Sequence, residues 1–345
     1  MLGNRNKHEL RDTSLNALYI VTLFVLILFF FVFGSSMYSG RNIQSMAYQI
    51  PEFGFVALGM MFSFMIGGID LSIIANANLS GILAANILMG TWLGGVPEPT
   101  RIVLAILMAL TSSLVFGAFN GLLITKFGVP SLIATLGTMT LYSGIGMALT
   151  GGKSLVGFPK RFTAMGISEV FGIPVIFIIF TAVAVILGFL VKYTVAGRRI
   201  YLMGTNPVAA RFSGIDNDTL LIFIFMLTGL LGGLSGLTII SRVNSAKVGY
   251  GDAYLLQALV VCVIGGIHPE GGRGRIIGVM ITIALLQMMS SAFTILQLSP
   301  FAKKLIWGSM LIVVMGLTKE GPRIVAFVKK VTSSIRVSRL KEGRV

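Results

Sequence analysis

Residues 197–215 read Gly-Arg-Arg-Ile-Tyr-Leu-Met-Gly-Thr-Asn-Pro-Val-Ala-Ala-Arg-Phe-Ser-Gly-Ile, a basic island in a chain that is otherwise apolar. Asn206 has a side chain that caps helix N-termini, and Pro207 suits the first turn of a helix. Gly214 is a natural helix terminator. The stretch therefore predicts a helix of about two turns between Asn206 and Gly214.

This predicted helix has two faces. Val208 and Phe212 lie on one face, and Arg211 lies on another. Isolated helices of this length are unstable in water, so we expect the helix to dock against another surface. A short, docked helix between membrane spans indicates a contact site through which another protein transmits movement to this one.

The composition is that of an integral membrane protein. Apolar residues make up 55% of the chain and charged residues 11%, with a mean hydropathy of +0.91. Soluble domains carry about 25% charged residues. Stretches of about 20 apolar residues predict an all-α protein of about ten transmembrane helices. The expected spans are 17–37, 52–68, 72–92, 102–125, 130–150, 173–192, 218–240, 254–267, 275–298 and 301–317, and either 130–150 or 254–267 is a candidate for a broken or re-entrant segment.

The remaining segments are short and hydrophilic. We expect a cytoplasmic N-terminal segment at 1–16, one transmembrane domain at 17–317 with a coupling loop near 193–217, and a basic cytoplasmic tail at 318–345. With an even number of spans, the inner segments hold 18 of the 27 Lys and Arg residues. This places both termini in the cytoplasm. The tail carries eight basic and two acidic residues, so it is either solvated or bound to anionic membrane lipid.

Several classes of function are excluded by what the sequence lacks. The basic residues flank spans and form no groove with interleaved aromatic residues, so we expect no nucleic acid. The acidic residues and both histidines fall at span ends or in loops, which argues against proton coupling. No pattern predicts a catalytic group, a metal site or a cofactor on this chain. Residues 151–154, Gly-Gly-Lys-Ser, lack the first glycine of a phosphate-binding loop, because position 147 is Met147.

Uncharged polar residues do occur inside the expected spans. They either form hydrogen bonds between helices or line a polar path, and such a path suits a neutral, hydroxyl-rich solute. The path candidates are Asn76, Asn78, Asn120, Thr135, Thr138, Gln257 and Gln287.

Two further patterns concern how helices begin and pack. Asp70 and Ser72 are expected to start the third span on the cytoplasmic side, with Asp70 as the cap. Glycines also recur at a spacing of four, which lets helix backbones approach closely within one subunit or between subunits. These pairs are Gly117 and Gly121, Gly229 and Gly233, Gly232 and Gly236, and Gly274 and Gly278.

Five motifs in this order resemble the permease subunits of bacterial ABC importers for simple sugars, the ribose, galactoside and autoinducer-2 group. The resemblance covers about residues 45–317. Its landmarks are Gly67-Gly-Ile-Asp-Leu-Ser72, Asn120-Gly-Leu-Leu through Met139, Gly197-Arg through Ile215, Ser241-Arg-Val-Asn-Ser-Ala246, and Val263-Ile-Gly-Gly266 followed by Gly271-Gly-Arg-Gly274.

The resemblance implies a transport subunit and no enzyme. Two permeases, identical or paralogous, would form the path, and two cytoplasmic ATPase subunits or one fused tandem ATPase would bind ATP and Mg. A binding protein outside the cytoplasmic membrane would deliver the sugar. ATPase motion would enter through a coupling helix between spans six and seven. The resemblance places the coupling residues at Arg198, Gly204, Asn206, Pro207, Ala209, Ala210, Arg211 and Gly214.

The sequence departs from this family at residues 255–257, Leu-Leu-Gln, and at residues 267–270, Ile-His-Pro-Glu. These changes leave the exact sugar and the symmetry of the dimer open. An autoinducer-2-like molecule or a nucleoside is an alternative substrate. A self-sufficient secondary carrier or facilitator for a neutral solute is the alternative function.

Overall fold

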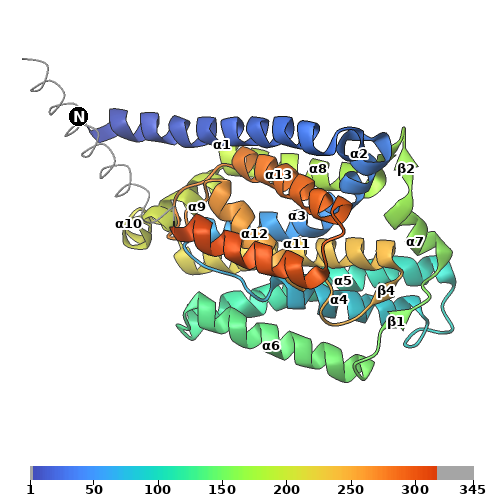
Figure 1. Cartoon of the computed structure of the whole chain (residues 1–345). Coiled ribbons are helices and arrows are strands. Elements are labelled where there is room, and N and C mark those ends of the chain that lie inside the picture. The colour runs from blue at the N-terminus through green and yellow to red at the C-terminus, as the bar shows by residue number, and fades with distance from the viewer. Residues whose placement is uncertain (1–2, 317–345) are drawn as a thin grey trace, which may run out of the picture.

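A computed structural model describes residues 3–316 as a bundle of helices lying side by side (Figure 1). The helical character expected from the sequence is confirmed. Five of the described helices are long and apolar enough to cross a membrane. They are α5 (Glu98–Lys126), α6 (Ser131–Thr150), α8 (Val175–Tyr193), α11 (Asn217–Val243) and α13 (Ile276–Ile295).

Five further helical segments coincide with the other expected spans: α1 (Gly3–Phe33), α3 (Gly40–Met65), α4 (Ile73–Leu88), α12 (Asp252–Ile264) and residues 300–316. With 16 and 13 residues, α4 and α12 are only about 24 and 20 Å long. Nearly every residue of α4 is buried, because other helices surround it. Residues 130–150, which the sequence left open as a broken segment, hold the continuous helix α6.

The helix that holds the expected second span begins well before residue 52. Helix α3 begins at Gly40 and continues through Pro51, and all residues from Pro51 to Met65 are buried. The early turns of α3 carry Arg41, Gln44 and other polar side chains, so a hydropathy pattern does not include these turns in the apolar segment. The proline therefore stands inside the helix and does not mark its start.

Small elements join the long helices. They include the helices α2 (Ser35–Tyr38), α7 (Lys160–Ile167), α9 (Val195–Thr205) and α10 (Pro207–Phe212). Strand β1 (Leu155–Val156) pairs with β4 (Ser245–Ala246), and β2 (Glu169–Val170) pairs with β3 (Ile173–Pro174), both antiparallel. The all-α expectation did not include these two short pairings.

Helix α11 lies at the centre and packs against α3, α4 and α5. Its glycines make this close approach possible: a Cβ at Gly229 would lie 2.3 Å from the carbonyl oxygen of Ser113 in α5, and a Cβ at Gly236 would lie 2.3 Å from that of Ala77 in α4. From the other side, a Cβ at Gly117 would lie 2.2 Å from the carbonyl oxygen of Phe225. These glycine positions therefore serve packing within one subunit.

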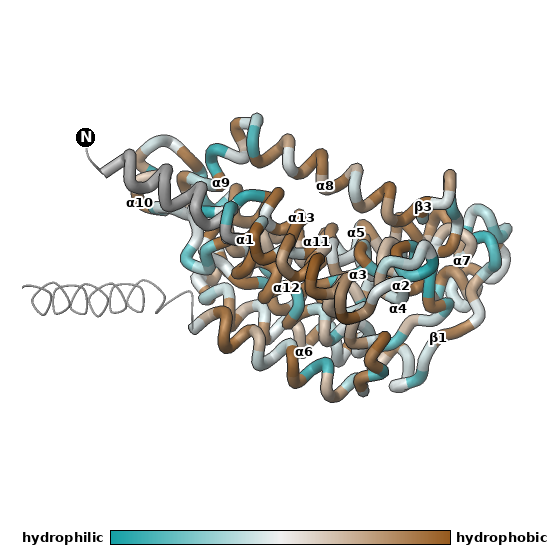
Figure 2. The backbone as a smooth tube through the Cα atoms, turned by 45° about the horizontal axis from the view of Figure 1, so that its top comes forward, coloured by the Kyte–Doolittle hydropathy of each residue, from teal (hydrophilic) through white to brown (hydrophobic). Residues whose placement is uncertain are grey.

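The two ends of the bundle differ in what they carry. One end holds α9 and α10, and the opposite end holds α7 and the strand pairs (Figure 1). Hydrophilic segments gather at these ends, whereas the helices between them are mainly hydrophobic (Figure 2). The predicted basic tail, residues 318–345, lies outside the described residues.

Candidate functional site

The short helix predicted from residues 206–214 is present as α10. The Oδ1 atom of Asn206 accepts a hydrogen bond from the backbone N–H of Ala209 at 3.0 Å, and Pro207 occupies the first turn. The carbonyl of Asn206 accepts from the N–H of Ala210 at 3.0 Å. Gly214 ends the segment with a φ of +78°, a backbone conformation that favours glycine.

Helix α10 turns its apolar side chains outward. Val208 is 65% exposed and Phe212 is 89% exposed, whereas Ala210 is buried. Arg211 lies 3.6 Å from the carboxylate of Asp218, and both side chains are exposed, so this ion pair contributes little to stability. Within the described residues, the predicted docking face has nothing packed over it.

The chain then enters α11 through a second cap. Both the N–H of Asp218 and that of Thr219 donate to Oδ1 of Asp216. The Thr219 hydroxyl also donates to Asp216, and this bond is the main reason that the pKa of Asp216 lies below its ordinary value. Two consecutive caps thus fix the path of the backbone from α9 to α11.

Helix α9 is locked to the rest of the bundle through glycines. A Cβ at Gly204 would lie 1.9 Å from the carbonyl oxygen of Met65, at the end of α3. That same oxygen accepts a hydrogen bond from the N–H of Gly272 at 2.9 Å, in the loop between α12 and α13. Tyr201 donates to the carbonyl of Gly274 at 2.6 Å. Arg198, another predicted coupling residue, lies on the exposed side of α9.

Asp70 is buried, with an exposed fraction of 1%. Its Oδ1 accepts from the N–H of Ser72 at 3.0 Å and from the Ser72 hydroxyl at 2.7 Å, directly before α4. Its Oδ2 accepts from the hydroxyl of Thr228 in α11 at 2.9 Å. Asp70 therefore holds Ser72, the residue directly before α4, and joins it to α11, but the N-cap position of α4 is Ser72 and not Asp70 as the sequence predicted.

Several predicted path residues belong to the same polar network. The amide of Asn120 donates to the Ser72 hydroxyl at 2.7 Å, and Thr138 donates to Asn120 at 2.7 Å. Thr135 donates to the carbonyl of Ile69 at 3.0 Å. These bonds join α4, α5 and α6, so the side chains act between helices in this structure.

The other candidates separate into two groups. Asn76 donates to the carbonyl of Ser113 at 3.0 Å, and Gln287 donates to Gln49 at 3.2 Å. Asn78 and Gln257 are only 8% and 6% exposed. Among residues 3–316, the side chains of these two residues have no hydrogen-bond partner. Among the described residues, the fully buried side-chain polar atoms without a partner belong to Thr22, Arg101 and Asn217, so the amide atoms of Asn78 and Gln257 reach accessible space where water or a polar solute can bond them.

An ionisable cluster contradicts the expectation that all acidic residues fall at span ends or in loops. Glu52 lies within α3 and is 1% exposed. Its Oε1 accepts from Nε of Arg242 in α11, and its Oε2 accepts from the hydroxyl of Tyr254 in α12 at 2.6 Å. Sequence reasoning missed this cluster because the partners lie 190 and 202 residues further along the chain.

No group of three or more His, Cys, Asp or Glu side chains in residues 3–316 is arranged to hold a metal ion. The lone Cys262 is buried within α12.

Known proteins with similar sequences show the family of this chain. A family model described as a branched-chain amino acid transport system / permease component matches residues 42–315. The chain belongs to this permease family. The chain is 35% identical to the ribose import permease protein of Bacillus subtilis, over 86% of this chain and 91% of the relative. It is 30% identical to the D-allose transport system permease protein of Escherichia coli, over 86% and 90% respectively.

The L-arabinose transport system permease protein of Escherichia coli is also 30% identical, over 79% of this chain and 80% of the relative. No solved structure matches the chain. The resemblance inferred from the five motifs is confirmed, and the permease is a multi-pass membrane transport subunit with no enzymatic activity of its own.

Proposed function

We propose that this permease is the membrane subunit of an ATP-driven sugar importer and that α10 is the helix through which a separate ATPase drives it. The exposed apolar face of α10 carries this proposal. A side chain such as Phe212, 89% exposed at the end of the bundle and away from the apolar helix surfaces, is suited to a pocket on another protein. Mg and ATP would be bound by that ATPase and not by this chain.

The glycine contacts around Gly204 support this role, because they connect α9 to two other parts of the bundle. A displacement of α10 would reach the end of α3 at Met65 and the loop between α12 and α13 at Gly272. The contacts involve backbone atoms, so the segments have little freedom to slide past one another. Movement of α10 would therefore be transmitted into the membrane helices.

The topology follows from the same assignment. The end with α9 and α10 would face the cytoplasm, and the end with α7 would face outward. The ten helical segments would then all cross the membrane, and longer helices would surround α4 and α12. Both termini would be cytoplasmic, in the inner membrane of a bacterium.

The substrate class follows from the relatives, whose names specify ribose, D-allose and L-arabinose. A monosaccharide or a similar neutral solute is the leading proposal, with an autoinducer-2-like molecule or a nucleoside as alternatives. Asn78 and Gln257 are the strongest residues for the path, because their side chains form no hydrogen bond within residues 3–316 and their amide atoms are not sealed from solvent. An amide both donates and accepts, as a sugar hydroxyl does.

The assembly would contain a second permease, the same or paralogous, two ATPase subunits or one tandem ATPase, and an extracytoplasmic sugar-binding protein. A reconstitution experiment tests the proposal. Proteoliposomes would hold this permease with or without its ATPase, and uptake of labelled ribose, allose and arabinose would be measured with binding protein outside and ATP inside. We expect uptake only when both ATPase and ATP are present.

A variant with Phe212→Ser should insert normally but lose most of the uptake, because the apolar contact with the ATPase is removed. Leu202, also exposed at 54% but on α9, offers a matched control in Leu202→Ser. Uptake by the permease alone would contradict the proposal and favour the self-sufficient carrier.

A further inference from the structure

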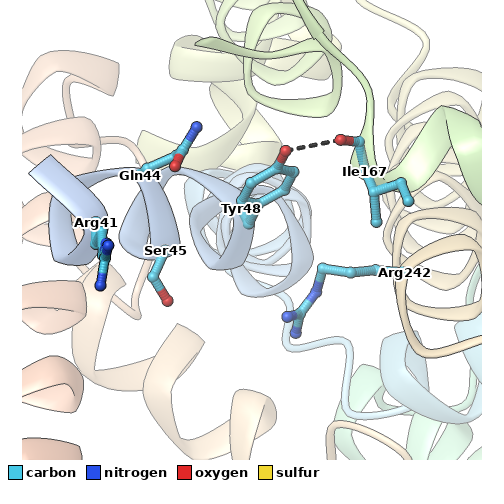
Figure 3. A pocket seen from close by; sticks show the side chains of 6 residues that line it. All are labelled: Arg41, Gln44, Ser45, Tyr48, Ile167 and Arg242. Atoms are coloured by element: carbon cyan, nitrogen blue, oxygen red, sulfur yellow. Dashed lines mark hydrogen bonds between the residues drawn. The ribbon is translucent and has the colours of Figure 1, made fainter. Parts of the chain in front are cut away.

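A polar cavity lies at the end of the bundle opposite α10. It has a volume of about 300 Å³ and is lined by six residues from α3, α7 and α11 (Figure 3). This volume lies at the lower end of the range for small-molecule sites. The lining residues are Arg41, Gln44, Ser45, Tyr48, Ile167 and Arg242.

The two arginines give the cavity its chemical character. Arg41 is exposed and forms no ion pair with any residue in 3–316. Arg242 is held to the buried Glu52 through its Nε atom alone, so the two terminal nitrogens of its guanidinium group stay available. The six lining residues thus include two guanidinium groups and no carboxylate.

The nearby carboxylates are engaged outside the lining. Glu52 is bound by Arg242 and Tyr254 within the bundle. Glu169 accepts hydrogen bonds from Gln44 at 2.6 Å and from Tyr48 at 2.7 Å. Tyr48 also donates to the carbonyl of Ile167 at 2.8 Å, which is the bond drawn in Figure 3. These bonds fix the cavity wall, and they use the single hydroxyl hydrogen of Tyr48 and one of the two amide N–H groups of Gln44.

The donors left for a ligand are therefore the guanidinium groups of Arg41 and Arg242, the hydroxyl of Ser45 and the second amide N–H of Gln44. A neutral sugar hydroxyl both donates and accepts, and this lining offers it no charged acceptor. A carboxylate or phosphate only accepts, and guanidinium groups match its geometry with paired hydrogen bonds. The lining therefore favours an anion over a neutral sugar.

We propose that this cavity binds a single anionic group, a carboxylate or a phosphate group, between Arg41 and Arg242. The group would be carried by a small molecule or by a lipid headgroup. Neither Asn78 nor Gln257, the residues of the proposed sugar path, lines this cavity. The proposal rests on the cavity and its charges and does not depend on the coupling role of α10.

The test uses the full-length chain in nanodiscs of zwitterionic lipid, without the ATPase, so that no nucleotide site contributes. Binding of ³²P-labelled inorganic phosphate is measured by scintillation proximity in wild type, Arg41→Gln and Arg161→Gln. Arg161 is an exposed arginine of α7 that does not line the cavity. We do not substitute Arg242, because its loss would leave the buried Glu52 without its charge partner.

We expect saturable phosphate binding whose apparent Kd rises about 10–100-fold in Arg41→Gln and stays unchanged in Arg161→Gln. A second arm repeats the comparison in nanodiscs that contain phosphatidylglycerol, with native mass spectrometry of the lipid retained. Retention of phosphatidylglycerol by wild type but not by Arg41→Gln, without binding of free phosphate, would identify a lipid headgroup as the ligand.

Equal binding by Arg41→Gln and wild type in both arms would overturn the proposal, as would the absence of any binding. Capture of an acidic protein at Arg41, with neither phosphate nor phosphatidylglycerol bound, would also overturn it and assign the cavity to protein docking.

Discussion

Replacement of Gly229 by alanine tests whether α11 is packed as tightly as the structure indicates. The added Cβ would lie 2.3 Å from the carbonyl oxygen of Ser113 and 3.0 Å from the Cα of Gly117. Both neighbours are backbone atoms, so neither can rotate away, and α5 and α11 would have to separate by about 1 Å. Overpacking of this kind costs about 1–3 kcal/mol.

Gly137 in α6 provides the matched control, because a Cβ there would meet nothing within 4 Å. Alanine is a better helix former than glycine by about 1 kcal/mol, and this gain is common to Gly229→Ala and Gly137→Ala. The difference between the two variants therefore isolates the packing cost of about 1–3 kcal/mol.

The assay is thermal unfolding of the purified variants in one mild detergent. An unfolding entropy of about 2.1 cal/mol/K per residue gives a shift of about 1.6 °C per kcal/mol for a domain of about 300 residues, so Gly229→Ala should unfold at least about 1.6 °C below Gly137→Ala. If Gly229→Ala were as stable as Gly137→Ala, the close packing of α11 on α5 would be refuted.

Three further predictions concern polar groups. Asn120→Ala should lower the Tm, because it breaks hydrogen bonds between helices. Asn78→Ala should leave the Tm nearly unchanged and reduce sugar uptake. A lowered Tm in Asn78→Ala, with reduced uptake and an unchanged Tm in Asn120→Ala, would exchange the roles of the two residues. Glu52→Leu should destabilise the fold by about 1–3 kcal/mol. This is less than the 3–5 kcal/mol typical of a broken buried ion pair, because Arg242 is partly exposed and can reach water. A denaturation midpoint equal to that of wild type would contradict this prediction. The lowered pKa of Asp216 implies a contribution that is complete above its ordinary value of 3.8 and is lost as the pH falls through the lower folded-state value. The loss of Tm caused by Asp216→Ala should therefore be the same at pH 5 and pH 8, and a loss that changed between these two values would contradict the prediction.

Features that depend on neighbouring residues could be predicted from the sequence. Helix α10 is the clearest case, since its cap, its proline and its terminating glycine lie within nine residues of one another. Three of the four glycine pairs likewise predicted close packing between helices, because small residues at a spacing of four share one helix face. The pair Gly274 and Gly278 did not, because Gly274 lies in the loop before α13 with a φ of +149°. The positions of the long helices followed from hydropathy, apart from the polar first turns of α3.

Features that depend on distant residues could not be predicted. Whether Asn120 joins helices or lines a path depends on Ser72 and Thr138, which lie 48 and 18 residues away. The partners of Glu52 are further away still, and the sequence alone places this residue near the start of a span. Its burial became visible only when α3, α11 and α12 were packed together.

The central claim is that the exposed apolar face of α10 meets the ATPase, and site-specific crosslinking tests it most directly. Cys262, the only native cysteine, is buried, so single cysteines can be introduced at Phe212 and, as a control, at Phe171. Phe171 is fully exposed at the opposite end of the bundle, in the turn between β2 and β3. In native membranes treated with a thiol-directed crosslinker, the account predicts an adduct with the ATPase from Phe212→Cys and none from Phe171→Cys. The absence of an ATPase adduct from Phe212→Cys, in membranes where the ATPase is present, would contradict it.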